Sequence, residues 1–253
     1  MAVHEQAESG FGAGADDYEK GRPSYADDVV AWLVDRLGIA PGKRVVDLAA
    51  GTGKLTRLLV PTGAEVVAVE PVAAMRAQLE AAVPGVEAVD GTAERLPFDE
   101  ATVDAVTVAQ AFHWFDASAA MAEIGHVLRP GGGLGLVWNE RDAREPWVAD
   151  LSRLIRWDER ARWRVPYTLE EDWGAALASI GGPFTPPERY DSSYRQAMTP
   201  ETLVARVLST SYIADRSPEE RAELADQVRS VVAPLGDRFE LPYVTTAWVT
   251  HRT

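Results

Sequence analysis

The stretch Val45-Val46-Asp47-Leu48-Ala49-Ala50-Gly51-Thr52-Gly53-Lys54-Leu55-Thr56 decides the fold. The apolar residues around Asp47 predict a short buried strand, the small residues and glycines after it predict a tight turn, and Lys54 to Val60 predicts the start of a helix. A glycine turn lets the backbone approach a ligand closely, and the N-terminus of the following helix offers unpaired N–H groups. The sequence therefore predicts a nucleotide-type pocket at this turn.

Two common kinds of glycine loop do not match this stretch. A phosphate-binding P-loop needs a glycine five residues before its Gly-Lys pair and a hydroxyl residue after it, but Leu48 and Leu55 occupy those positions. A dinucleotide fingerprint needs a third glycine three residues after the second, and Thr56 stands there. The P-loop is excluded, and the second alternative, a nicotinamide oxidoreductase, is weakened.

The loop resembles that of the class I S-adenosylmethionine-dependent methyltransferases, in which an acidic residue ends the strand just before a small-residue Gly-x-Gly turn. Asp47, Gly51 and Gly53 match this pattern. Ala49 stands where the family usually has its first glycine, which implies a slightly less permissive turn. The resemblance implies S-adenosyl-L-methionine as the cofactor and these four residues as part of its binding site.

The composition favours a small-molecule partner. The chain has 253 residues, enough for one large α/β domain with insertions. Its 25 Lys and Arg against 39 Asp and Glu give a formal charge of −14, which argues against nucleic-acid and anionic-membrane partners. The chain has no cysteine, which excludes disulfides, a thiolate metal site and a cysteine nucleophile. We expect no bound metal.

The N-terminal segment carries no targeting signal. Residues 1–15 are small and polar, and we expect them to be flexible. They lack the basic and apolar regions of a signal peptide, and no stretch of the chain reaches the roughly 18 apolar residues of a membrane span. The sequence therefore predicts a soluble, cytoplasmic protein with no membrane partner.

A second buried strand over residues 63–70 ends in an acid, Glu70, which lies 19 residues after Gly51. An acidic side chain at the carboxyl end of this strand can accept hydrogen bonds from both hydroxyls of a ribose. The alternative is a surface acid that caps the next helix, which Pro71 starts. Met75, one turn into that helix, is a candidate for the adenine pocket, although a methionine on a helix face also suits a core.

A third strand over residues 86–90 leads into Gly91-Thr92-Ala93-Glu94-Arg95-Leu96-Pro97-Phe98. This run resembles the adenine-binding segment of the same family, in which many members carry an aspartate at the position of Thr92. A threonine hydroxyl can also accept from the adenine amine, less strongly than a carboxylate does. The resemblance makes Thr92 and Ala93 the adenine contacts.

Aromatic residues gather after the fourth strand, residues 102–109, in Gln110-Ala111-Phe112-His113-Trp114-Phe115-Asp116. Ligands of open α/β sheets bind at the carboxyl edge, where this segment lies; the alternative is an aromatic plug under the next helix. His113 and Trp114 each carry a polar atom that burial must satisfy, so we expect them at the substrate rim. His113 is also the candidate general base, because an imidazole titrates near neutrality.

The same segment resembles the corresponding loop of methyltransferases similar to trans-aconitate methyltransferase. That resemblance implies that Gln110 lies near the methionine end of the cofactor. Tyr18 and Arg22, just before an amphipathic helix expected over residues 26–37, resemble the N-terminal helix of small-molecule methyltransferases. In those proteins such residues close over the cofactor and meet its carboxylate.

The rest of the chain completes an α/β fold. Residues 128–139 predict a helix end, a glycine-rich turn and a fifth strand. We expect a helical insertion near the substrate pocket over residues 140–183 and a sixth strand over residues 189–197. Two helices with proline at their first position should start at Thr199 and Ser217, and a last strand should follow over residues 239–249. The resemblance implies a Rossmann-like, doubly wound, seven-stranded, mostly parallel sheet with an antiparallel last strand, in a single domain over 1–253.

Methyl transfer to a small-molecule acceptor is the predicted reaction, with the acceptor atom, O, N or C, left open. A general base is needed only if the acceptor starts protonated. Two alternatives remain: an enzyme of this fold that binds the cofactor but catalyses cyclisation or elimination, and a non-catalytic ligand-binding module. An aromatic acceptor suits the aromatic rim, whereas a carboxylate suits Arg141, Arg144 and Arg164. The sequence gives no oligomeric state.

Overall fold

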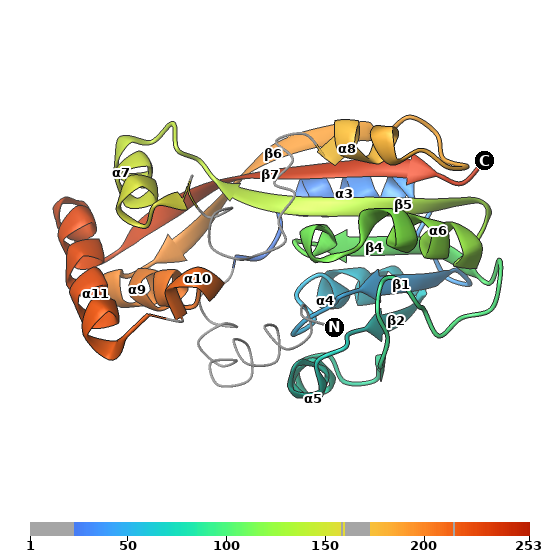
Figure 1. Ribbon diagram of the computed structural model, residues 1–253, viewed down its shortest axis with the longest axis horizontal. Coiled ribbons are helices and arrows are strands. Elements are labelled where there is room, and N and C mark those ends of the chain that lie inside the picture. Colours follow the sequence, from blue (N-terminus) through green and yellow to red (C-terminus); the bar gives the residue numbers. More distant parts are fainter. Residues whose placement is uncertain (1–22, 158, 160–172, 215) are drawn as a thin grey trace. The chain divides into compact units, whose positions relative to one another are not determined.

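The computed structural model describes residues 23–157, 159, 173–214 and 216–253 (Figure 1). Tyr18 and Arg22, two predicted cofactor contacts, lie outside the described residues, as does the segment 1–15 that we expected to be flexible.

The described strands form one seven-stranded sheet in the order β3-β2-β1-β4-β5-β7-β6. Strands β1, β2, β3, β4 and β5 pair in parallel. The last strands are antiparallel. Just beyond β7, the Gly131 N–H donates to the Arg252 carbonyl and the Arg252 N–H donates to the Gly132 carbonyl, and Phe184 bridges Arg252 in the antiparallel sense. The strands are β1 (Arg44–Leu48), β2 (Glu65–Val69), β3 (Glu87–Val89), β4 (Val103–Ala109), β5 (Leu128–Arg141), β6 (Glu188–Met198) and β7 (Phe239–His251).

Helices cover both faces of this sheet. Leu134 and Leu136 of β5 pack in one core with Ile124 of helix α6, whereas a Cβ at Gly135 would lie 2.9 Å from side-chain atoms of α3. Since successive strand residues point to opposite faces, α3 and α6 lie on opposite sides, and the predicted doubly wound, Rossmann-like fold is confirmed. The helices are α3 (Asp27–Arg36), α4 (Thr56–Leu59), α5 (Ala73–Ala82), α6 (Ala117–Val127), α7 (Pro146–Leu154), α8 (Trp173–Ile180), α9 (Pro200–Leu208), α10 (Ser211–Ala214) and α11 (Pro218–Val232), with the 3-10 turns η1 (Val60–Thr62), η2 (Phe112–Trp114) and η4 (Ala233–Leu235).

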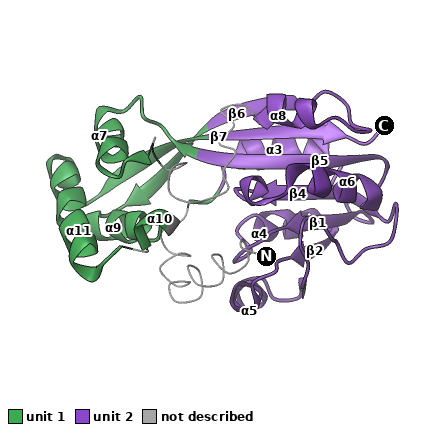
Figure 2. Ribbon diagram, in the orientation of Figure 1, with its two compact units in different colours: residues 1–24, 140–167, 193–244 green, residues 25–139, 168–192, 245–253 purple. Residues whose placement is uncertain are grey.

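The chain groups into two compact units, coloured separately in Figure 2. Unit 1 takes residues 1–24, 140–167 and 193–244, and unit 2 takes residues 25–139, 168–192 and 245–253. Strands β5, β6 and β7 contribute residues to both units. The division does not decide the domain count, so a single domain over 1–253 stays a prediction.

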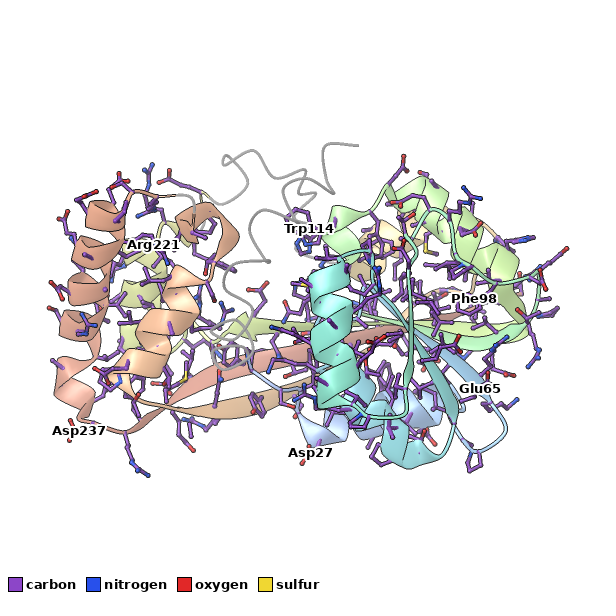
Figure 3. All side chains as sticks on the ribbon, turned by 90° about the horizontal axis from the view of Figure 1, so that it is seen from below. Asp27, Glu65, Phe98, Trp114, Arg221 and Asp237 are labelled. Atoms are coloured by element: carbon purple, nitrogen blue, oxygen red, sulfur yellow. The ribbon has the colours of Figure 1, made fainter. Side chains whose placement is uncertain are left out.

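Unit 1 has its own apolar core, which the sequence pattern did not indicate. Helices α7, α9, α10 and α11 pack side chains around Tyr243 and Leu241 of β7. Thr199 and Ser217 cap α9 and α11, each with a reciprocal capping box, so the two predicted helix starts are confirmed. Figure 3 labels Arg221 and Asp237 in this unit.

Two predicted segments differ from the structure. The helical insertion over residues 140–183 is divided, because α7 packs into the core of unit 1 while Trp173 and Leu177 of α8 pack into the core of unit 2. The glycine-rich turn is part of β5, where the pairing with β4 jumps from Leu128 to Gly133. A Cβ at Gly132 would lie 2.9 Å from two backbone oxygens, so glycine is required by close backbone approach at this bulge.

Candidate functional site

The glycine loop joins β1 to α4, and its two glycines have different tasks. Gly53, at φ +82°, packs on α5, because a Cβ there would lie 2.9 Å from Leu79 Cγ and 3.1 Å from Val83 Cγ2. Gly51, at φ +58°, has room beside it in the part of the chain that the structure describes, because the nearest atom to an added Cβ there is Met75 Sδ at 4.0 Å. Ala49 adopts φ +53°, which favours glycine, and this agrees with the less permissive turn expected there.

Glu70 follows β2 and turns its carboxylate toward this loop. Oε2 accepts a hydrogen bond from the Gly51 N–H at 2.9 Å, and Oε1 accepts from the Val72 N–H at 3.0 Å. Val72 is the N-cap residue of α5, so the capping role weighed for Glu70 is present. The acid is not a surface residue, however, since only 4% of Glu70 is exposed. A carboxylate oxygen has two lone pairs and can accept more than one hydrogen bond.

Asp47, at the end of β1, is buried with 1% of its surface exposed. Its Oδ2 accepts from Thr56 Oγ1 at 2.6 Å, and its Oδ1 accepts from Thr107 Oγ1 at 3.0 Å. Burial raises the pKa of Asp47 from 3.8 to about 6, the Glu70 charge adds to the rise, and the bonds from Thr56 and Thr107 oppose it. Asp47 thus joins β1, α4 and β4 at the root of the loop.

The segment after β3 lies beside these residues. Ala93 is buried in the same core as Leu48 and Val69, and Thr92 is half-buried and pairs its backbone with Arg95. Glu94 Oε1 accepts from the Asp116 N–H at 3.0 Å, which ties this segment to the one after β4.

The aromatic segment after β4 forms a stacked cluster. The His113 ring lies 5.1 Å from the Trp114 ring and 5.5 Å from the Trp138 ring, and Trp138 stacks on Trp173 at 4.9 Å. His113 and Trp114 are half-buried, whereas Trp138 and Trp173 are buried. Figure 3 shows Trp114 at the end of the unit 2 sheet opposite Glu65, where β2 begins. The cluster therefore stands at the carboxyl ends of the parallel strands, and its two outer rings are accessible.

Gln110 begins this aromatic segment. Its backbone has φ +58°, and its Nε2 donates to the Asn139 carbonyl at 3.2 Å. That bond joins the ends of β4 and β5, so Gln110 is fixed at the same edge of the sheet as the aromatic cluster.

Comparison with known proteins decides the family. Residues 46–136 match the family described as "Methyltransferase domain". An uncharacterized methyltransferase of Mycobacterium bovis is 43% identical over 241 residues, which cover 93% of this chain and 92% of that relative. The chain belongs to the class I S-adenosylmethionine-dependent methyltransferases. The predicted family is confirmed, while the narrower resemblance to the trans-aconitate methyltransferase group stays a prediction.

Solved structures share the fold of this methyltransferase. The phosphoethanolamine N-methyltransferase 2 of Haemonchus contortus, in complex with S-adenosyl-L-methionine, has a TM-score of 0.52 at 17% identity, over 98% of this chain and 56% of that one. The cyclase SpnF has a TM-score of 0.54 at 18% identity, over 92% and 83% of the two chains. At these identities the likeness supports the fold alone.

Several residues of this methyltransferase site were not found from the sequence. In the sequence analysis Thr56 served only as evidence against a dinucleotide fingerprint, whereas in the structure its hydroxyl donates a hydrogen bond to Asp47. Thr107 donates the second hydroxyl hydrogen bond to Asp47, and the feature that could have indicated it is a polar residue among the apolar residues of β4. Trp138 and Trp173 complete the aromatic cluster, and they carried no local signal because they lie far apart in the sequence.

The arginines considered for a carboxylate acceptor have other contacts. Arg144 bonds both oxygens of Asp142, each at 2.7 Å, and Arg141 stacks on the Trp157 ring at 4.3 Å. Arg164 lies outside the described residues. Among the helices that the structure describes, none combines the length and the apolar character needed to cross a membrane.

Proposed function

We propose that this methyltransferase binds S-adenosyl-L-methionine at the carboxyl ends of β1, β2 and β4 and methylates a small-molecule acceptor. One observation carries the proposal: the buried Glu70 carboxylate lies against the N–H of Gly51, where, among the described residues, the nearest atom to an added Cβ is Met75 Sδ at 4.0 Å. An acid at the end of the second strand next to a glycine turn is the arrangement that holds an adenosyl ribose.

The described residues fit this cofactor. A Cβ at Gly51 would occupy the open space beside the loop, so the glycine leaves room for the ligand chain. Glu70 accepts from the ribose hydroxyls, and Met75, Thr92 and Ala93 bound the adenine. Gly51, Gly53 and Ala49 let the backbone approach the methionine end of the cofactor. Gln110 lies near the same end.

The chain's own residues would mainly orient the reactants and exclude water. When bound, the cofactor supplies an electron-poor methyl group on a sulfonium. Alignment of donor and acceptor is the largest contribution to rate that such a site can make. His113 and Trp114, the accessible rings of the aromatic cluster, would hold the acceptor. His113 would take a proton from an acceptor that starts as a hydroxyl or phenol, and it would only orient a carboxylate.

The net charge of −14 supports a small-molecule acceptor over a nucleic acid, because a phosphate backbone is repelled. In the proposal Tyr18 and Arg22 close over the cofactor, and the protein works in the cytoplasm. Cyclisation is the second candidate reaction, because the cyclase SpnF has a similar fold.

Calorimetry with S-adenosyl-L-methionine and with S-adenosylhomocysteine tests the binding proposal. Incubation with methyl-labelled cofactor and a metabolite extract, followed by mass analysis, then tests the reaction. A labelled product heavier by one CH₂ supports methyl transfer, whereas a product of unchanged mass supports cyclisation. Absence of binding for both ligands would refute the proposed site, and binding without turnover across an acceptor panel would favour a ligand-binding module.

A further inference from the structure

The aromatic cluster of unit 2 is a row of rings in which each member contacts the next. Trp173 stacks on Trp138 at an interplanar angle of 21°. His113 follows, tilted at 55° against Trp138 and at 37° against Trp114. Trp173 and Trp138 have only 7% and 8% of their surface exposed, whereas His113 and Trp114 are half-buried. The row therefore runs from the core of the unit to its surface.

The buried end of the row belongs to the hydrophobic core. Trp173 and Trp138 pack in one core with Leu177 of α8, and Phe112 meets the Trp173 ring edge-on at 5.5 Å. These contacts fix the Trp138 ring, which in turn lies against His113. Because close packing holds the inner rings in one arrangement, the outer rings have a rigid support before any ligand arrives. A ligand that contacts them therefore loses less free energy in ordering the site.

The half-buried end of the row lies next to the glycine loop. Leu48, the last residue of β1, pairs with Val108 of β4, so the loop and the aromatic segment leave adjacent parallel strands at the same edge of the sheet. Ala49 of the loop and Trp114 also pack against the same core. Under the proposed function, an acceptor at His113 and Trp114 is therefore beside the methionine end of the cofactor.

Two kinds of ligand bind to aromatic side chains through their rings. A cation is held where several ring faces converge on it as a cage. An aromatic ring instead packs on another ring, stacked or edge-on, at roughly 4.5 to 7 Å between centroids. The cluster is built in the second way, because its rings follow one another at 4.9, 5.5 and 5.1 Å. Its geometry therefore favours a flat ring over a cation.

We propose that the methyl acceptor is an aromatic molecule whose ring extends this row by stacking on Trp114 beside His113. The inference rests on the proposed function and names the class of its acceptor. The reacting atom of the acceptor donates an electron pair to the methyl carbon, and the electron pair of the broken carbon–sulfur bond stays on the sulfur. A proton on the reacting atom passes to the His113 imidazole and then to water.

Calorimetry with two neutral probes tests the preference for an aromatic ring. The probes are 2-naphthol and decahydro-2-naphthol, which share one carbon skeleton, so burial of apolar surface alone gives them similar affinities. Each is titrated into wild-type protein saturated with S-adenosylhomocysteine, which has no methyl group to transfer. We expect 2-naphthol to bind more tightly by about fivefold or more, the effect of a stacked aromatic pair. Equal affinities, no binding of either probe, or tighter binding of tetramethylammonium than of 2-naphthol overturns the inference.

Two variants of Trp114 assign the preference to the aromatic cluster. Trp114→Leu keeps an apolar side chain but removes the ring, so the affinity difference between the two probes should disappear. Trp114→Phe keeps a ring and should keep most of the difference. Trp32→Leu is the matched control, because Trp32 is another half-buried tryptophan of unit 2 and stacks on Tyr190 at 5.5 Å. A difference that persists in Trp114→Leu, or is lost in Trp32→Leu, contradicts the assignment.

The labelled product formed from a metabolite extract gives a test that needs no variant. We expect this product to show the near-ultraviolet absorbance of an aromatic ring, and a labelled product without such a ring overturns the inference. Failure of the wild-type protein to bind either S-adenosyl-L-methionine or S-adenosylhomocysteine would refute the proposed function itself. Binding of both with no preference for the aromatic probe would refute only the acceptor class.

Discussion

The carboxylate of Glu70 accepts a hydrogen bond from the backbone N–H of Gly51 at 2.9 Å, although 19 residues separate them in the chain. The bond fixes the glycine loop against the end of β2, and Glu70 is buried there. Loop geometry and the acid are therefore coupled, so a change at either residue should affect the same ligand.

Replacing Glu70 with alanine should weaken binding of S-adenosyl-L-methionine by roughly 1 to 3 kcal/mol, the cost of leaving buried polar groups without a partner. Calorimetry at pH 7.5 measures the change. Glu65→Ala is the control, because Glu65 is exposed at the start of the same strand. Equal Kd values for wild type and both variants would show that Glu70 only caps α5.

A Gly51→Val substitution should abolish cofactor binding, because its branched side chain enters the open space beside the loop. Gly38→Val is the matched control: Gly38 has φ +61° and no atom within 4 Å of a Cβ, so it adds the same backbone strain elsewhere. Both variants should lose about 1 to 3 kcal/mol of stability. Unchanged affinity in folded Gly51→Val protein would contradict the assignment of the loop.

A His113→Asn substitution should lower kcat by roughly 100-fold or more if the imidazole removes a proton from the acceptor. It should also flatten the pH dependence of kcat. A rise in KM with unchanged kcat would instead assign His113 to acceptor orientation. His126→Asn, an exposed histidine in the last turn of α6, is the control and should behave as wild type.

Asp104→Asn should destabilise the protein at pH 7 and not at low pH. Burial alone would raise the pKa of Asp104, but the Arg44 N–H and the Arg129 and Lys43 side chains outweigh it and hold the pKa below 3.8. A lowered pKa in the folded state gives stability that is present above the unfolded value and lost as the pH falls through the folded value.

Urea unfolding at pH 7 should show a loss of roughly 1 to 3 kcal/mol for Asp104→Asn, toward the lower end because Lys43 and Arg129 are about half exposed. The difference from wild type should shrink by pH 3. A difference that stays constant between the two pH values would mean that Asp104 acts by shape and not by charge.

The order of the elements was predictable because its signals are local. The apolar run at Val45, the glycines after it and the capping residues Thr199 and Ser217 fixed the strand, the turn and the two helix starts. The candidate residues of the loop were found for the same reason, since the acid and the glycines lie within a few positions of one another.

The division between the two cores had no such signal. Helices α7 and α8 follow one another among the described helices and are both amphipathic, yet α7 packs with α9 and α11 while Trp173 of α8 packs on Trp138. An apolar helix face specifies that it is buried, and not which distant element buries it.

The sequence by itself determined the strand order along the chain, the glycine turn and the acids that end β1 and β2, because hydrophobic period and turn chemistry act between near neighbours. Only the tertiary structure decided what those acids do. Asp47 meets Thr107 across 60 residues, and Glu70 meets Gly51 across 19. Burial and charge depend on such distant contacts, because they exist only once parallel strands have paired and brought their carboxyl ends together.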